Sequence, residues 1–391
     1  MGSVRTVDLH TGPGLTTASP GPCRTRQASS AAATSWFRPL VWLTAAMIVW
    51  AIVSAIGVVV DHRALGGEPI WAKPLKFSVS LGAYSITLAW MLEHIDKPRL
   101  RRIARFAAAG GAAAALTEIT IISVQVIRGI PSHFNVSTAL NSALYSVMGA
   151  GAVVLFMTTA VVGCALAYFT TLPDRSIQWS LRWAVPIALA GLSVGFVMII
   201  PTAQQATLSA PRTLGTHSIG GDDTSGGLFL LGWNTMHGDL RIAHFVGMHA
   251  LQALPLIALT LAVGGRHRLG ERSRLEIVSL ISTAWAALTA ITLWQALRGQ
   301  SVVHPDALTW AVVAAIVGYG VVAIIIILAR SRHRRCSTSA HERRSVTTAE
   351  PTPELGRYSA AAQKITGSGS DHTAVHRSCN SSPTTAKLPI E

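Results

Sequence analysis

Residues 307–329 read ALTWAVVAAIVGYGVVAIIIILA, an apolar run without a single charged side chain. About twenty apolar residues in an α-helix cross the hydrocarbon layer of a bilayer, so this run predicts a membrane-spanning helix. Earlier apolar blocks of similar length cover residues 39–60, 77–95, 103–127, 140–169, 183–202, 243–264 and 276–297. The sequence therefore predicts an all-α membrane protein with eight transmembrane helices in a lipid bilayer.

The composition divides the chain into three parts. Hydrophobic residues make up 50% of the chain and charged residues 13%, whereas a soluble domain carries about 25% charged residues. Residues 1–37 and 330–391 contain few large apolar side chains and many Ser, Thr, Ala, Pro and Arg residues. Such segments bury too little surface to fold, so both are predicted to be disordered tails that flank a transmembrane domain at 38–329.

Lysine and arginine residues predict the orientation in the membrane. The loops after the second, fourth and sixth predicted spans contain basic residues at 97–105, at Arg175 with Arg182, and at 266–274. Cytoplasmic loops are enriched in such residues, so these loops and both chain ends are predicted to be cytoplasmic. The formal net charge of +14 then reflects topology and basic cytoplasmic segments that face anionic lipids, and it requires no nucleic acid partner.

One short motif occurs twice, at the ends of the third and seventh predicted spans. Residues 125–129 read QVIRG and residues 295–299 read QALRG, so both match Gln-x-x-Arg-Gly. In the predicted topology both motifs lie at the outer end of an outward-going helix. The pattern pairs Gln125 with Gln295 and Arg128 with Arg298.

A second repeated pattern, a pair of basic residues, lies at the start of the second and sixth predicted spans. Lys73 and Lys76 precede one span, and Arg241 and His244 precede the other. These repeated patterns predict two parallel four-helix halves, at about 38–170 and 180–329, with a site between them, as in several transporter folds. The alternative is chance, because Gln and Arg are common where helices leave a membrane.

Polar residues at membrane depth identify candidate site residues. Glu118 lies well inside the third predicted span, where a carboxylate is costly unless it faces the bundle or a water-filled cavity. Gln125 lies two turns further along the same face, and Arg128 is close to the same line. This stripe predicts either a contact to a proton, cation or ligand, or a neutral acid that only fixes helix packing.

A histidine cluster lies at the outer entry of the sixth predicted span. It contains His237, His244 and His249, with Gln252 one turn beyond the last of them. Imidazole is a common ligand of transition metals and haem, and His133 lies in another outer loop of the predicted topology. His244 and His249 point in different directions on a helix, so a metal at His249 needs a ligand from another segment. The alternative is that His249 and Gln252 form hydrogen bonds between helices.

The outer loop at about 203–242 contains a glycine-rich stretch at 218–227. No strand precedes this stretch in the predicted topology, so it is not interpreted as a phosphate-binding loop. It is interpreted as a plain solvent loop, with a flexible lid as the alternative.

Three stretches carry a resemblance to a known group of proteins. They are residues 71–77 (WAKPLKF), residues 128–135 (RGIPSHFN), and residues 238–252, which begin GDLR and end HALQ. The chain resembles a family of uncharacterised bacterial multi-pass inner-membrane proteins over its membrane region. The resemblance implies location in a bacterial cytoplasmic membrane, and it carries over no catalytic residue.

These observations favour transport or binding of a small, anionic solute at an outward-facing polar site without a bound cofactor. A first alternative is a membrane oxidoreductase that binds haem or a transition metal through His249 with His133, His244 or His237. A second is a structural or assembly protein whose polar groups only pack helices. The candidate ligand-binding residues are Lys73, Lys76, Glu118, Gln125, Arg128, His133, Arg241, His244, His249, Gln252, Gln295 and Arg298.

Overall fold

The computed structural model describes residues 36–224, 227–265 and 269–347. The helices are α1 (Arg38–Val60), α2 (Ala72–Glu93), α3 (Pro98–Arg128), α4 (Ala139–Phe169), α5 (Arg175–Met198), α6 (Ala203–Ala206), α7 (Leu240–Met248), α8 (Ala250–Gly264), α9 (Glu271–Leu297) and α10 (Ala307–Thr347). Two short antiparallel hairpins, β1 (Ala64–Leu65) with β2 (Glu68–Pro69) and β3 (Ser218–Ile219) with β4 (Gly238–Asp239), lie in the loops.

The length and composition of the helices fit a multi-pass membrane protein. Seven described helices are long and apolar enough to cross a membrane, and the bent pair α7–α8 would count as an eighth span. Large apolar side chains stay exposed on the bundle, including Trp42 at 73% on α1 and Tyr319 at 69% on α10. Such surface is typical of a face that contacts lipid rather than water.

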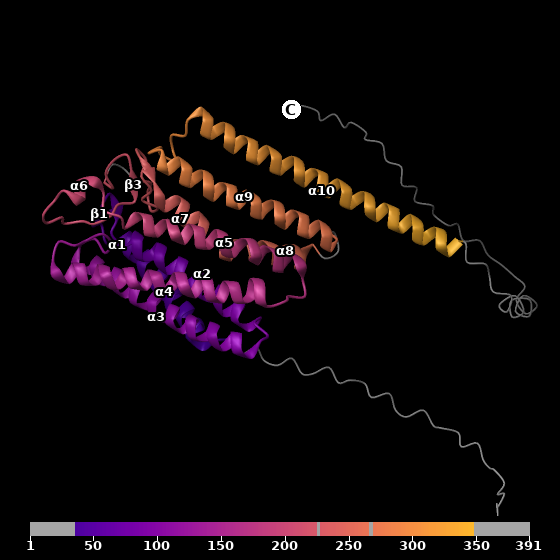
Figure 1. The fold of residues 1–391 in the computed structure, drawn as a ribbon, viewed down its shortest axis with the longest axis horizontal. Helices are drawn as coiled ribbons and strands as arrows, with labels where there is room; N and C mark the ends of the chain where they lie inside the picture. Colours follow the sequence, from indigo (N-terminus) through magenta and orange to yellow (C-terminus); the bar gives the residue numbers. More distant parts are fainter. Residues whose placement is uncertain (1–35, 225–226, 266–268, 348–391) are drawn as a thin grey trace, which may run out of the picture. The chain divides into compact units, whose positions relative to one another are not determined.

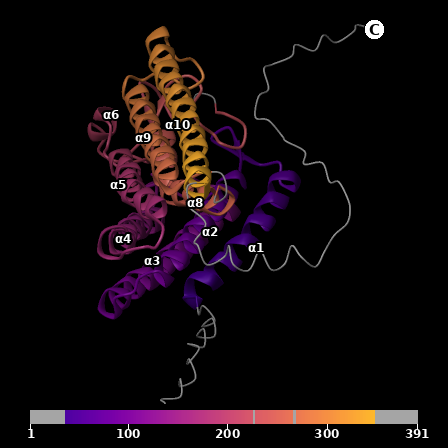
Figure 2. The same cartoon turned by 90° about the vertical axis from the view of Figure 1, so that its right-hand side faces the viewer.

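The helices pack as neighbours along the chain. Helix α1 packs on α2 and α3 packs on α4, while α5 contacts α4, α7, α8 and α9 (Figures 1 and 2). The main apolar core joins α2, α4, α5 and α8 through Leu88, Leu166, Leu181 and Leu251. Helix α10 continues to Thr347, beyond the predicted end of the last span at 329, and the rest of the predicted C-terminal tail lies outside the described residues.

Helices α2 and α5 begin earlier than the sequence predicts. Helix α2 begins at Ala72 instead of residue 77, so Lys73 lies in its first turn and Lys76 at the start of its second, rather than before the helix. Pro74 is compatible with this position, because the first turn of a helix has no internal partners for its N–H groups. Helix α5 begins at Arg175 instead of residue 183, because the Asp174 carboxylate accepts hydrogen bonds from the first backbone N–H groups.

The sixth predicted span, 243–264, is not one continuous helix. The chain bends by 40° between α7 and α8, and His249 is the residue at the break. Helix α7 lies against α5 at unusually short range, because a Cβ atom built at Gly191 would lie 2.6 Å from Gly247 Cα. Glycines at a helix crossing permit this backbone-to-backbone contact.

Candidate functional site

Both β-hairpins and the long loop at about 203–242 lie at one end of the bundle. Helix α6 and strands β1 and β3 lie at this end, on the left in Figure 1. Helices α2, α4 and α7 begin here, and α3, α5 and α9 end here. We call it the loop end. The basic residues predicted from the sequence to face outward belong to the helix termini and loops of this end.

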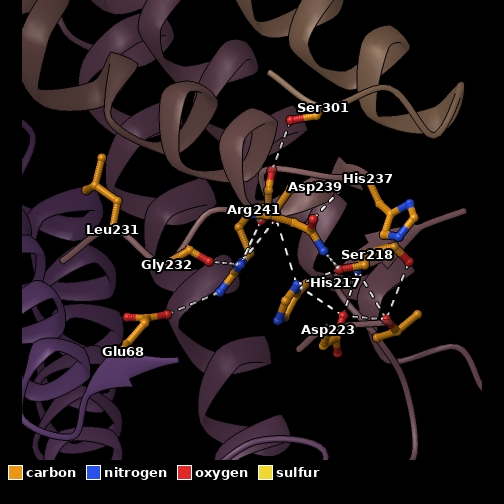
Figure 3. Close-up of polar contacts among 12 residues, drawn as sticks. Glu68, His217, Ser218, Asp223, Leu231, Gly232, His237, Asp239, Arg241 and Ser301 are labelled. Atoms are coloured by element: carbon orange, nitrogen blue, oxygen red, sulfur yellow. Dashed lines mark hydrogen bonds and ion pairs between the residues drawn. The ribbon is translucent and has the colours of Figure 1, made fainter. Parts of the chain in front are cut away.

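Arg241, in the first turn of α7, lies at the centre of a polar network at this end (Figure 3). Its guanidinium pairs with the Asp239 carboxylate at 2.7 Å and donates a hydrogen bond to the Gly232 carbonyl. A second carboxylate, Glu68 from the β1–β2 hairpin, lies 3.8 Å away. The Asp239 side chain is fully buried, and its Oδ1 accepts a hydrogen bond from the Arg241 backbone N–H, which caps helix α7.

Lys76 belongs to the same network. Its ammonium group pairs with Glu68 at 2.6 Å and donates to the Leu231 carbonyl at 2.8 Å. Glu68 therefore links the start of α2 to the start of α7. These are the two helix starts whose basic residues the predicted repeat pairs. The charges of Lys76 and Arg241 are already balanced by carboxylates of the protein.

The glycine-rich stretch is tied into this network by its acidic residues. Asp223 accepts hydrogen bonds from Thr216 Oγ1 at 2.7 Å and from the Ser218 backbone N–H at 2.9 Å. Asn234 donates to Ser218 Oγ and to the Asp222 carbonyl, each at 3.0 Å. The described part of this stretch, residues 218–224, is therefore hydrogen-bonded to the loop end, while most of its residues stay exposed to solvent.

His217 lies between two carboxylates of the loop. Its Nδ1 is 3.2 Å from Asp223 and 4.0 Å from Asp239. Burial lowers the pKa of His217 to about 4, and the charge of Arg241 acts in the same direction. The pKa of Asp239 is also lowered, because its hydrogen bonds and ion pair with Arg241 outweigh the effect of burial. His217 is therefore neutral at pH 7.

Acidification is expected to destabilise the loop end through His217. The unfolded chain binds a proton at the ordinary histidine pKa near 6.5, whereas folded His217 binds it only near pH 4. Between these values the unfolded state binds more protons, so stability falls as the pH falls. Unfolding of the purified protein should be compared at about pH 7 and about pH 5.

The matched variants are His217→Asn and His304→Asn, the second at an exposed loop histidine. His217→Asn should flatten the pH dependence and His304→Asn should leave it unchanged. Equal slopes for all three proteins would contradict the assignment.

Lys73 differs from its neighbours because its hydrogen-bond partner is an imidazole. Its Nζ lies 3.0 Å from His133 Nδ1, which is also 3.1 Å from Ser132 Oγ. Burial and the charge of Lys73 lower the pKa of His133 well below its usual range, so this imidazole is neutral and can accept the bond. Among the described residues, no carboxylate lies within ion-pair distance of Lys73.

Glu118 lies inside the bundle, as expected for a carboxylate that avoids lipid. It is only 5% exposed, and its Oε2 has no hydrogen-bond partner within the part of the chain that is described. Lys73 and Glu118 act on each other electrostatically, although they are not in ion-pair contact. Gln125, on the same helix, is 1% exposed.

The repeated Gln-x-x-Arg-Gly motif forms the same helix ending twice. Gly129 and Gly299 adopt left-handed backbone conformations with φ of 72° and 70°. Backbone hydrogen bonds from Ile130 to Gln125 and from Gln300 to Gln295 close both ends, as in a Schellman motif. Each glutamine also donates to the carbonyl six residues later, at 3.4 Å to Pro131 and 2.9 Å to Ser301.

The arginines of the two motifs have different partners. Arg128 donates to Gln125 at 2.6 Å and to Asn141 of α4 at 3.0 Å. Arg298 pairs with Asp306 at 2.7 Å and stacks over Trp294 at 4.4 Å. Arg298 therefore has its own carboxylate, whereas Arg128 is held by neutral amides.

The histidines of α7 and α8 bond to backbone carbonyls. His244 Nδ1 lies 2.8 Å from the Gly191 carbonyl of α5, and His249 Nδ1 lies 2.8 Å from the Phe245 carbonyl. The Gln252 amide lies beside the His249 and Met248 carbonyls. Among the described residues, no group of three or more His, Cys, Asp or Glu side chains is placed to hold a metal ion, with or without His237, His133, His244 or His249.

The sequence interpretation missed three acidic partners at this end. Glu68 and Asp239 balance Lys76 and Arg241, and Asp306 balances Arg298. Asp239 carried a recognisable signal, because an Asp directly before an apolar helix is a common N-cap. Asp306 carried the same signal, since it directly precedes α10 and its Oδ1 accepts a hydrogen bond from the Thr309 backbone N–H. Glu68 carried none, since its partners depend on how the loops fold.

The fold and the loop end define an all-α, multi-pass membrane protein with a polar network at one end of the bundle. Comparison of the chain with protein-family models, with curated proteins and with solved structures found no match in any of the three. The function is therefore inferred from the site itself.

Proposed function

We propose that this protein transports or binds a small anionic solute at its outward-facing loop end in a bacterial inner membrane. The observation that carries this proposal is Lys73, whose ammonium contacts a neutral imidazole and no carboxylate of the described chain. Lys76, Arg241 and Arg298 each have a carboxylate partner. An ammonium group without a counter-ion in a partly buried position is a natural partner for an anion.

The surrounding residues suit such a ligand. His133 and Ser132 place polar groups beside Lys73, and Arg128 carries a positive charge held only by amides. The matching helix ends of α3 and α9 support an arrangement of two parallel halves with the site between them. Parallel repeats with a site at their interface occur in several transporter folds.

Replacing Lys73 with methionine is expected to weaken anion binding strongly. A hydrogen bond to a charged group contributes about 1.5–3 kcal/mol, which corresponds to roughly a 10- to 100-fold loss of affinity. Binding of acetate, phosphate and chloride to the purified protein in lipid nanodiscs can be measured by calorimetry. Arg298→Gln is the matched control, because Asp306 already balances the Arg298 charge.

The proposal fails if Lys73→Met binds every anion as tightly as the parent, or if the parent binds none. Uptake of the bound anion into proteoliposomes then separates a transporter from a receptor. Uptake that depends on Lys73 supports transport, and binding without uptake supports a receptor.

A further inference from the structure

Glu118 occupies a position in which its carboxylate can be neutralised by binding a proton. Its carboxylate lies against the backbone of α4, because a Cβ atom built at Gly151 would lie 3.0 Å from Oε1. The side chain is 5% exposed, and Oε2 has no hydrogen-bond partner among the residues that the structure describes. A buried carboxylate with an unpaired oxygen is unfavourable when it is ionised, and adding a proton removes the charge.

Few charged residues lie on the helices that surround Glu118. Helices α1, α2 and α4 pack on α3, which carries Glu118. Helix α4 contains no charged residue, and Arg38, the one charged residue of α1, begins that helix at the opposite end of the bundle from the loops. Helix α2 carries Lys73, Lys76 and Glu93, and of these Lys73 acts electrostatically on the Glu118 carboxylate. Among charged groups, the Glu118 carboxylate therefore interacts with Lys73, whereas Lys73 also interacts with Lys76, Arg241 and Glu68.

We propose that Glu118 is a proton-binding site coupled to the anion site at Lys73, an inference that rests on the proposed function. When Glu118 is ionised, it partly balances the charge of Lys73 and competes with an anion. When its carboxylate takes up one proton from water, Lys73 lacks that balance and attracts the anion. One proton and one monoanion then enter together without a change in net charge.

Thermodynamic reciprocity makes the coupling measurable from the anion side. Anion affinity of the full chain in nanodiscs should increase as the pH falls, by roughly 5- to 150-fold, the range of typical coupling between sites. Glu118→Gln mimics the protonated acid in shape and charge, so it should bind acetate with an affinity that no longer depends on pH. Glu276→Gln, at a partly exposed carboxylate of α9 that pairs with Arg272, should behave as the parent does.

Infrared spectroscopy tests the proton site without any anion. The C=O stretching band of a protonated carboxyl group should appear in the parent as the pH falls, shift in D2O, and disappear in Glu118→Gln. The same spectrum for parent and Glu118→Gln would overturn the proton site, whatever the binding data show.

The two proposals fail in different ways. Loss of acetate binding in Lys73→Met together with an unchanged pH dependence in Glu118→Gln would leave the anion site standing and overturn the coupling. A Glu118 band without any anion binding by the parent would overturn the proposed function and, with it, the coupling.

Discussion

Gly191→Ala is expected to destabilise the protein by about 1–3 kcal/mol, the usual cost of forcing an extra methyl group into a packed interior. A Cβ atom at this position would lie 2.5 Å from the Met248 backbone nitrogen and 2.6 Å from Gly247. Both contacts are with backbone, which cannot rotate away as a side chain can. Helices α5 and α7 would have to separate, and the hydrogen bond from His244 to the Gly191 carbonyl would be strained.

Gly149→Ala is the matched control, because open space surrounds the place in helix α4 that its added methyl group would take. Alanine is the better helix former by about 0.5–1 kcal/mol, so this variant should be neutral or slightly more stable. Thermal unfolding in detergent measures both. Gly247→Ala introduces the same clash from the other helix and should resemble Gly191→Ala. Equal melting of the position 191 and position 149 variants would mean that the two backbones do not touch.

Asp239→Asn is expected to cost about 3–5 kcal/mol, the range found when one partner of a buried ion pair is removed. The Asp239 side chain is fully buried and pairs with Arg241, and it accepts hydrogen bonds from the backbone N–H groups of Asn234 and Arg241. An amide in this place has one acceptor fewer and turns a donor toward other donors. Glu68 remains 3.8 Å from Arg241, which places the expected loss toward the lower end of the range.

The control for this variant is Glu276→Gln in the exposed pair with Arg272 on α9. Exposed pairs of this spacing contribute about 0.3–0.5 kcal/mol, so the change should be barely measurable. Limited proteolysis of residues 199–239 provides a second readout, because loss of Asp239 should open the loop specifically. An Asp239→Asn protein as stable and as protease-resistant as the parent would show that the loop network contributes little.

The sequence indicated candidate residues for the site but not how they pair with one another. Lys73, Lys76, Arg241 and Arg298 were identified by position relative to the predicted spans, and all four lie at helix termini of the loop end. Their different roles could not be predicted, because ion pairing joins residues that are far apart in the chain. Glu68 and Arg241 are the clearest example.

Hydropathy determined the class of protein, the number of apolar blocks and the approximate place of each helix, because it depends only on neighbouring residues and the width of a bilayer. The motif at 125–129 determined its own helix ending, since a left-handed glycine closes a helix locally. Tertiary structure alone decided the break at His249, the burial of Asp239 and, within the described chain, the lack of a carboxylate beside Lys73. Each of these depends on which backbone group or carboxylate from another part of the chain lies nearby. The spacing of residues along the sequence does not give that distance in space.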